Sequence, residues 1–441
     1  MKRSTTWLAL IGLSLSSFIG CIDLTIVNTA LPAIQHSLNA SVDALQWVIN
    51  ILLLTLSAVM VVLGRLADLH GRRKMLYMGM ALFAISSLVA GLAPSITWLL
   101  VGRSLQGIAV AILYAMPVAM IPSLFPLKQQ GKATGILIGA NGFGLAFGLV
   151  AGGLILSVLS WRWIFLINPP LILLSFLFCM TTIPESKTND LNRQIDWLGL
   201  ILLIIALPLL VLAIIQGSEW GWLSFKTLGT AGIAIIGLIV FYLHEQRHPS
   251  PIIQFHFFSH RLFGVGMISN VMLAAFYAVT FFLVPLYMSN VLHQSEAVIG
   301  LTMLPGMLLV AILSPVVGMI VDKVGAPTVL LIGLALLIVC AGLQVTFSST
   351  TPLWFVVLAM IFLGLGWGFL LGPALVLALS TVPKESSGVG IGTLGTMHNL
   401  GGSIGLAVGT VVFHTYHYAG AMAFLMVLSV IAFMGTWVGR K

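Results

Sequence analysis

Charged side chains are scarce in this sequence. Asp, Glu, Lys and Arg make up only 7% of its 441 residues, whereas they make up about a quarter of a typical soluble protein. Hydrophobic residues account for 59%, and the mean hydropathy is +1.13. Apolar stretches of about 20 residues, long enough to cross a hydrocarbon core of about 30 Å, recur from Trp7 to Trp437. We predict that they are α-helices, because backbone groups in lipid need partners within their own segment.

Other features are also missing, and each absence excludes a class of protein. Cys21, Cys179 and Cys340 fall in predicted spans without metal-ligand spacing, so we expect buried apolar side chains and no metal site. No GxxxxGK phosphate-binding loop occurs, which argues against direct use of ATP, and no cofactor is expected. Paired carboxylates and histidines one helical turn apart are absent from the predicted spans, so an intramembrane enzyme is not expected. The loops are too short for the soluble signalling domain of a membrane receptor.

Proline, glycine and charged clusters divide the chain into fourteen predicted spans. The net charge of +8 arises from Lys and Arg in short loops rather than on one face of a soluble domain, so no nucleic-acid partner is expected. These basic residues gather in alternate loops, which predicts that both termini are cytoplasmic. The spans cover residues 7–31, 45–64, 75–93, 97–120, 132–158, 162–182, 198–216, 226–243, 262–289, 297–321, 328–347, 353–378, 387–413 and 419–438.

An internal repeat follows the second and the tenth span. A GxxxDxxG pattern occurs at the cytoplasmic end of each, and two copies at equivalent places indicate two parallel halves. We therefore expect an N-terminal six-helix bundle in residues 1–184 and a C-terminal six-helix bundle in residues 261–441. Residues 185–260 would form a linker with two inserted transmembrane helices. The two copies consist of Gly64, Asp68 and Gly71, and of Gly318, Asp322 and Gly325.

Several segments resemble the fourteen-helix drug:proton antiporter branch of the major facilitator superfamily. The resemblance implies a multi-pass protein of a cell membrane, such as a bacterial inner membrane, that works as a monomer and exports small molecules in exchange for protons by alternating access. Leu149 departs from the branch, which has proline at that place, and His398 stands where members often carry arginine. The segments are IDLTIVNTALP (22–32), GRLADLHGRRKML (64–76), LLVGRSLQGIAVA (99–111), SWRWIFLINPP (160–170) and DWLG (196–199).

Only one acidic and one guanidinium side chain are embedded in the predicted spans. Asp23 and Arg103 lie at similar depths, and an ionisable group in a span is a functional candidate by default. In one interpretation the pair is a proton switch, because Arg103 nearby favours the ionised carboxylate and its withdrawal favours the protonated form. In the other, it is a static bridge. His398 is a candidate for a second titrating group. Alternatively, its side chain forms a hydrogen bond to a neighbouring helix.

Two further sets of residues follow from their positions. The first is a conformational-switch loop, which comprises Gly64, Asp68, Gly71, Arg72, Arg73 and Asp322. The second set contains polar residues of the spans, which are candidates for the substrate cavity or for contacts between helices: Asn28, Asn50, Gln106, Asn141, Asn270 and Tyr277.

The substrate class stays open at this point. A carrier of dicationic compounds would be expected to hold extra carboxylates, so a neutral, zwitterionic or anionic substrate is as compatible with this sequence as a cationic one. A facilitator or proton symporter for a nutrient, or an exporter dedicated to one metabolite such as a siderophore, is the alternative to a drug exporter.

The predicted orientation is testable by cysteine labelling. In a variant without the three native cysteines, Ser295→Cys should react with an impermeant thiol reagent added to intact cells, because its loop is predicted to lie outside. Ser386→Cys should react only after the cells are opened. The reverse pattern would contradict the topology.

Overall fold

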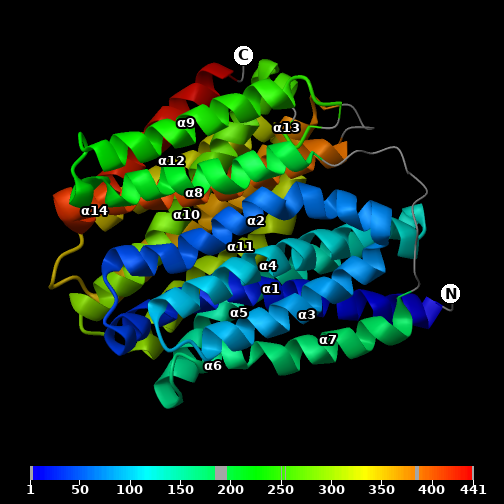
Figure 1. The fold of residues 1–441 in the computed structure, drawn as a ribbon, viewed down its shortest axis with the longest axis horizontal. Helices are drawn as coiled ribbons and strands as arrows, with labels where there is room; N and C mark the ends of the chain where they lie inside the picture. The colour runs from blue at the N-terminus through cyan, green and yellow to red at the C-terminus, as the bar shows by residue number, and fades with distance from the viewer. Residues whose placement is uncertain (1–2, 184–195, 250, 254, 383–386, 440–441) are drawn as a thin grey trace. The chain divides into compact units, whose positions relative to one another are not determined.

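In the computed structural model, residues 3–183, 196–249, 251–253, 255–382 and 387–439 are described (Figure 1). These ranges are almost entirely helical and contain no β-strand. The helices are α1 (Arg3–Leu38), α2 (Val42–His70), α3 (Arg72–Gly91), α4 (Ile96–Leu124), α5 (Leu127–Val158), α6 (Trp163–Leu166), α7 (Asn168–Thr182), α8 (Trp197–Trp220), α9 (Phe225–Glu245), the 3₁₀ helix η1 (Phe255–Ser259), α10 (Arg261–Asn290), α11 (Glu296–Val324), α12 (Ala326–Val345), α13 (Leu353–Leu379) and α14 (Ser387–Gly439).

The number of spans agrees with the sequence prediction. Thirteen helical segments of the described chain are long and apolar enough to cross a membrane. The last of them, Gly392–Gly439, has 48 residues, and at about 1.5 Å per residue it is more than twice as long as a bilayer core is thick. Its backbone leaves the helical conformation at His417 (φ 60°, ψ −166°), so it comprises two spans. The all-α, fourteen-span architecture is thereby confirmed.

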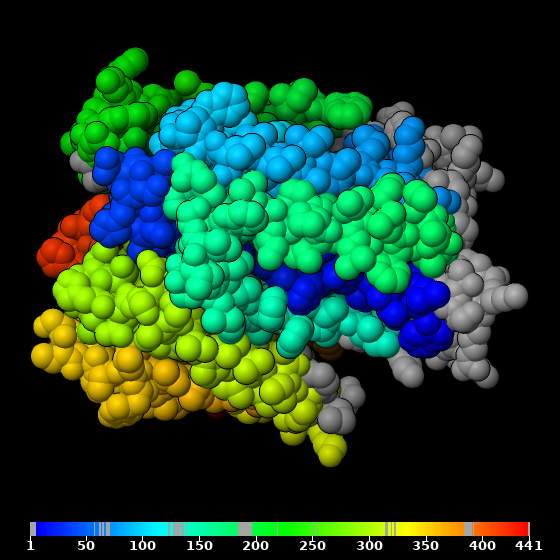
Figure 2. All heavy atoms as spheres, turned by 90° about the horizontal axis from the view of Figure 1, so that it is seen from below, coloured from blue at the N-terminus to red at the C-terminus, as the bar shows by residue number. Residues whose placement is uncertain are grey.

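The helices group into two compact units. The first contains Met1–Ile195 with Ser295–Leu301, and the second contains Asp196–Gln294 with Thr302–Lys441. In the first unit α1 packs against α5 and α7, and α3 packs against α4 and α7; Figure 2 shows the surface of α7 beside α3 and α1. In the second unit α10 packs against α14, α12 against α13, and α8 against α9.

The interior of the first unit is apolar. Leu13, Leu76, Phe83 and Leu113 are fully buried in one cluster, which also contains Cys179. All three cysteines are unbridged and buried, as the sequence predicts.

Three glycines allow α5 to lie directly on α1. Gly144, Gly148 and Gly152 recur every four residues and therefore share one face of α5. A Cβ atom added to Gly148 would lie 2.2 Å from the Thr25 hydroxyl oxygen and 2.8 Å from the carbonyl oxygen of Ile22. Because the helices are so close, the Thr25 hydroxyl donates a hydrogen bond of 3.0 Å to a carbonyl of α5, that of Leu145. This packing fixes the position of α1, which carries Asp23.

The repeated turn is tighter than the sequence indicates. Gly64 and Gly318, the first glycines of the two copies, lie within α2 and α11. The turn itself is a single residue in each copy, Gly71 (φ 97°) and Gly325 (φ 82°), a backbone region that favours glycine. The amide of Gly71 donates to the carbonyl of Ala67, four residues before it, and that of Gly325 donates likewise. The two halves therefore share this turn in their backbone geometry.

The α1–α5 packing is testable with two alanine substitutions in α5. Gly148→Ala should lower the unfolding free energy by about 1–3 kcal/mol, because backbone atoms of α1 must shift to admit the methyl group. Gly139→Ala is the control, since nothing lies within 4 Å of its added Cβ, and its effect should be neutral or stabilising by about 0.5–1 kcal/mol. Thermal unfolding in detergent measures both, and equal midpoints would contradict the prediction.

Candidate functional site

The two embedded charges of the sequence form an ion pair in the first unit. Arg103 of α4 donates from Nη1 to Oδ2 of Asp23 in α1 over 2.5 Å. The side chains are 2% and 0% exposed. Short hydrogen bonds between charged groups are stronger than those between neutral groups. The pair therefore links α1 and α4.

The guanidinium group of Arg103 has further partners on α2 and α4. Its Nε donates to the carbonyl oxygen of Val48 over 3.1 Å, and Nη1 also donates to Oε1 of Gln106 over 2.9 Å. Its Cζ atom lies 5.9 Å from the ring centroid of Phe165, within cation–π range. The cation is therefore held on several sides, and its orientation is fixed.

The carboxylate of Asp23 receives donors from side chains of two other helices, α4 and α7. Besides Arg103, its Oδ1 accepts from Nδ2 of Asn168 in α7 over 3.4 Å and from Nε2 of Gln106 over 3.2 Å. Both amide groups also donate to the hydroxyl oxygen of Ser87 in α3, over 2.9 Å from Gln106 and 3.2 Å from Asn168. The result is a closed polar network in an apolar bundle. Each buried ion forgoes hydration worth several kcal/mol, and this network replaces part of it.

Sequence reasoning identified the ions but missed much of their surroundings. Ser87 and Asn168 are polar residues within predicted spans, which is the signal that could have found them. Gln46 of α2 is a third such residue: it is fully buried, and neither atom of its amide group has a hydrogen-bond partner in the described part of the protein. Gln106, a candidate for the substrate cavity or for contacts between helices, hydrogen-bonds Asp23, Arg103 and Ser87.

In the second unit, three predicted residues meet in a separate cluster. Nδ1 of His398 in α14 lies 2.9 Å from Oδ1 and 3.2 Å from the backbone oxygen of Asn270 in α10. Because the backbone oxygen can only accept, Nδ1 carries the hydrogen of the neutral ring. The His398 ring stacks on Tyr277 at 5.6 Å, and Tyr277 stacks on Trp367 of α13 at 4.6 Å. This arrangement leaves Nε2 as the acceptor nitrogen of the neutral histidine.

The remaining predicted cavity residues lie in the first unit. Nδ2 of Asn28 donates to the carbonyls of Leu24 and Thr25 in its own helix. Asn50 is buried on α2, and Asn141 is 8% exposed on α5. Among the described residues, the hydrogen bonds of Asn28 stay within α1 and do not join it to Arg103.

An apolar cavity of about 350 Å³ lies between α1 and α5. Leu10, Phe18 and Ile136 line it, and none of its described lining residues is ionisable. Phe18 also stacks on Phe143 and Phe147 of α5 at about 6 Å. This part of the first unit thus offers aromatic and aliphatic surface rather than charge.

The arginines of the repeated turn connect three helices. Arg72 donates from Nη1 to the carbonyl of Ala119 in α4 over 2.6 Å. Arg73 donates from Nη2 to the carbonyl of Met180 in α7 over 3.3 Å, and from Nε to the Tyr77 hydroxyl over 2.9 Å. The side chains of Asp68 and Asp322 lie outside the described residues. The turn is thus tied to neighbouring helices of its own unit.

A family model described as Major Facilitator Superfamily matches residues 13–405 and 266–441 of the chain. The chain is 33% identical over 407 residues to the Multidrug resistance protein Stp of Mycobacterium tuberculosis, covering 92% of this chain and 75% of that protein. It is 30% identical over 417 residues to the Tetracenomycin C resistance and export protein of Streptomyces glaucescens, covering 92% and 76%.

Among solved structures, the chain resembles that of the xylose transporter XylE from E. coli in a partially occluded inward open conformation. The TM-score is 0.67, and the likeness covers 99% of this chain and 98% of that one. At 15% sequence identity it bears on the fold alone.

A double-mutant cycle tests the ion pair. Arg103→Gln should lower the unfolding free energy by about 3–5 kcal/mol, because it leaves a buried carboxylate without its cation. The double variant Asp23→Asn with Arg103→Gln should lose less unfolding free energy than Arg103→Gln alone, since neither residue of the pair is then charged. Lys226→Gln, at an exposed lysine, is the control and should stay within about 0.5 kcal/mol. Additive costs in the double variant would contradict an energetic link between the two residues.

Proposed function

The chain belongs to the major facilitator superfamily and is a membrane transporter rather than an enzyme, and from this premise we propose that it exports small organic molecules in exchange for protons. The observation that carries the proposal is the buried Asp23–Arg103 pair. An isolated acid in a membrane span is costly, and this one has a partner whose movement would change how readily it binds a proton. The names of the relatives, which speak of multidrug resistance and of antibiotic export, support efflux.

Proton coupling would work through the partners of Asp23. With Arg103 at 2.5 Å, the ionised carboxylate is favoured. If α4 moves relative to α1 during the transport cycle, the guanidinium withdraws, and a carboxyl group left in an apolar setting favours the protonated form. Gln106 and Asn168 can still donate to the carboxyl oxygens and keep the side chain in place. Proton uptake would thus be tied to a helix movement.

His398 is the second candidate for proton coupling. Its Nδ1 is engaged by Asn270, which leaves Nε2 to accept a proton or a substrate donor. Its stacking on Tyr277 would stabilise the protonated ring through a cation–π interaction. Asn270, Tyr277 and His398 would then form a substrate-binding cluster within the second unit.

The proposed cycle is alternating access between two six-helix bundles, residues 1–184 and 261–441, with an inserted pair within 185–260. The turns at Gly71 and Gly325 would act in the conformational switch. We further propose cytoplasmic termini, a bacterial inner-membrane location and a monomer as the working unit. The substrate is proposed to be amphipathic, because the aromatic and aliphatic cavity between α1 and α5 offers dispersion contacts and no counter-charge.

The direction of transport is tested in cells first. Expression of the chain should lower the accumulation of some members of a panel of labelled amphipathic antibiotics and dyes, and a proton uncoupler should abolish that decrease. Increased accumulation of a nutrient would instead favour the facilitator or symporter alternative.

Proton coupling is tested in liposomes with Asp23→Asn. This variant mimics the permanently protonated acid, so an imposed pH gradient should no longer drive uphill transport, while downhill exchange of an exported compound should persist. A pH-sensitive dye inside the vesicles reports the accompanying proton flux. Glu219→Gln, at an exposed residue near the end of α8, is the control and should keep the wild-type rate. Uphill transport by Asp23→Asn at that rate would exclude Asp23 and direct attention to His398.

A further inference from the structure

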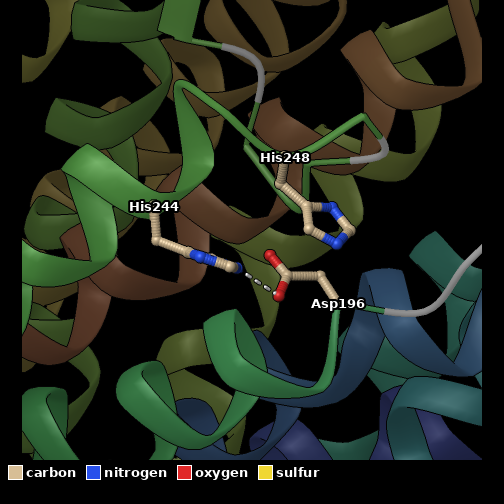
Figure 3. A group of neighbouring side chains, drawn as sticks. All are labelled: Asp196, His244 and His248. Atoms are coloured by element: carbon tan, nitrogen blue, oxygen red, sulfur yellow. Dashed lines mark hydrogen bonds and ion pairs between the residues drawn. The ribbon is translucent and has the colours of Figure 1, made fainter.

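Four ionisable residues meet where the start of the inserted helix α8 lies beside the end of the inserted helix α9. Asp196 immediately precedes α8, and His244 and Glu245 occupy the last turn of α9. His248 lies one turn further, since its amide donates to the carbonyl of His244 over 3.0 Å. Figure 3 shows the carboxyl group of Asp196 between the two imidazole rings. All four residues belong to the second unit.

The geometry around Asp196 is compact. Its Oδ1 accepts from the amide of Gly199 over 2.8 Å and lies 2.8 Å from Nε2 of His244. The rings of His244 and His248 are 5.2 Å apart between centroids. One potential ligand atom from each of Asp196, His244 and His248 lies within 4.8 Å of the others. Because the Gly199 amide fixes the carboxyl group at the start of α8, the three side chains are already oriented toward one point.

A second buried carboxyl group lies beside the first. Glu245 is 3% exposed and Asp196 is 2% exposed. Oε2 of Glu245 accepts from the amide of Ile253 over 2.9 Å, but Oε1 of Glu245 and Oδ2 of Asp196 have no hydrogen-bond donor in the described part of the protein. Both oxygens border Gly199, where an added Cβ would lie 2.3 Å from Oδ2 and 2.7 Å from Oε1. Two buried carboxyl groups that both border Gly199 would repel each other if both were ionised, and a bound cation or a proton would relieve that repulsion.

The two histidines reach Asp196 from α9 and from the turn that follows it. Nε2 of His244 lies 2.8 Å from Oδ1 of Asp196, and a ring nitrogen of His248 lies within 4.8 Å of the other two ligand atoms. Two imidazole groups and a carboxyl group therefore come together at one place, beside a second buried carboxyl group.

We propose that Asp196, His244 and His248 bind one divalent cation of the zinc class where the start of α8 lies beside the end of α9. Two imidazole nitrogens and one carboxylate oxygen are a ligand set that Zn²⁺ accepts, with the fourth position left to water. The cation would balance the two buried carboxylates. It would also fasten the end of α9 to the start of α8, because its ligands come from both.

The sequence carried a signal for this site that the prediction of spans concealed. His244 and His248 are four residues apart, the spacing of two ligands on one helical face. The eighth span was predicted to end at residue 243, which placed both histidines in a loop. In the structure α9 continues to Glu245, and the following turn keeps the helical hydrogen bond to His248.

Zinc binding by the purified full-length protein is the direct test. The protein is prepared in detergent without a polyhistidine tag, which would itself bind the metal, and is titrated with Zn²⁺ against a fluorescent zinc indicator. We expect one Zn²⁺ per chain and a higher thermal midpoint with Zn²⁺ than with EDTA, since a ligand that binds only the folded state stabilises it. Co²⁺ in place of Zn²⁺ should give the visible absorption of a tetrahedral complex.

Substitution of the ligands locates the site. His248→Gln and Asp196→Asn should each weaken Zn²⁺ binding by more than about tenfold, since even the loss of an outer partner costs about 10- to 100-fold. His244→Gln keeps a donor toward Asp196 and removes only the imidazole, so it tests binding with the helix ends still joined. His256→Ala, at an exposed histidine of η1, should bind Zn²⁺ as the wild type does.

Two outcomes would overturn the proposal. One is a folded wild-type protein that binds no Zn²⁺ and whose thermal midpoint EDTA leaves unchanged, which would mean that a proton on Glu245 alone balances the cluster. The other is unchanged Zn²⁺ affinity in folded His244→Gln and His248→Gln proteins, which would place the bound metal elsewhere.

Discussion

The first unit is organised around one electrostatic constraint, the burial of the Asp23 carboxylate in an apolar bundle. A charge in that position is tolerated only if donors surround it. Arg103 supplies the opposite charge at 2.5 Å, and Gln106 and Asn168 supply neutral donors. Since these partners come from α4 and α7, the relative placement of helices α1, α4 and α7 is set largely by one acid.

The helix packing that surrounds the acid serves this constraint. Gly148 lets α5 contact the backbone of α1 near Ile22, one residue from Asp23. Ser87 of α3 accepts from both amides that donate to Asp23, so α3 is included in the same network. An apolar contact can slide with little loss, but a network with directed donors cannot. The ion pair therefore gives the bundle a defined register as well as a charge balance.

Hydropathy and residue scarcity made part of this structure predictable from the sequence. Fourteen spans follow from apolar stretches and the proline, glycine and charged breaks between them. Asp23 and Arg103 stood out because no other acid or guanidinium is embedded in these spans. Ser87, Asn168 and Gln46 could not be singled out in this way. Whether a polar residue faces another helix depends on how its own helix is rotated about its axis. These helices are apolar on all sides, so the sequence does not reveal that rotation. One helix end was also misplaced: α2 runs through Gly64 to His70, and the positive-φ turn that follows it is at Gly71.

The two halves share a turn but not an embedded charge. Gly71 and Gly325 adopt the same left-handed conformation and the same hydrogen bond to the preceding helix, so the repeat preserves the device that joins two helices tightly. The ion pair has no counterpart among the spans of the second half, whose polar cluster of His398, Asn270 and Tyr277 is neutral when the histidine is. Under the proposed function, the conformational switch is thus duplicated while the proton chemistry is divided unequally. The ion-paired carboxyl group of Asp23 would be the proton site of the first half, and the aromatic-lined His398 would be that of the second. Such a division lets one half respond mainly to protons and leaves the other freer to vary with the substrate.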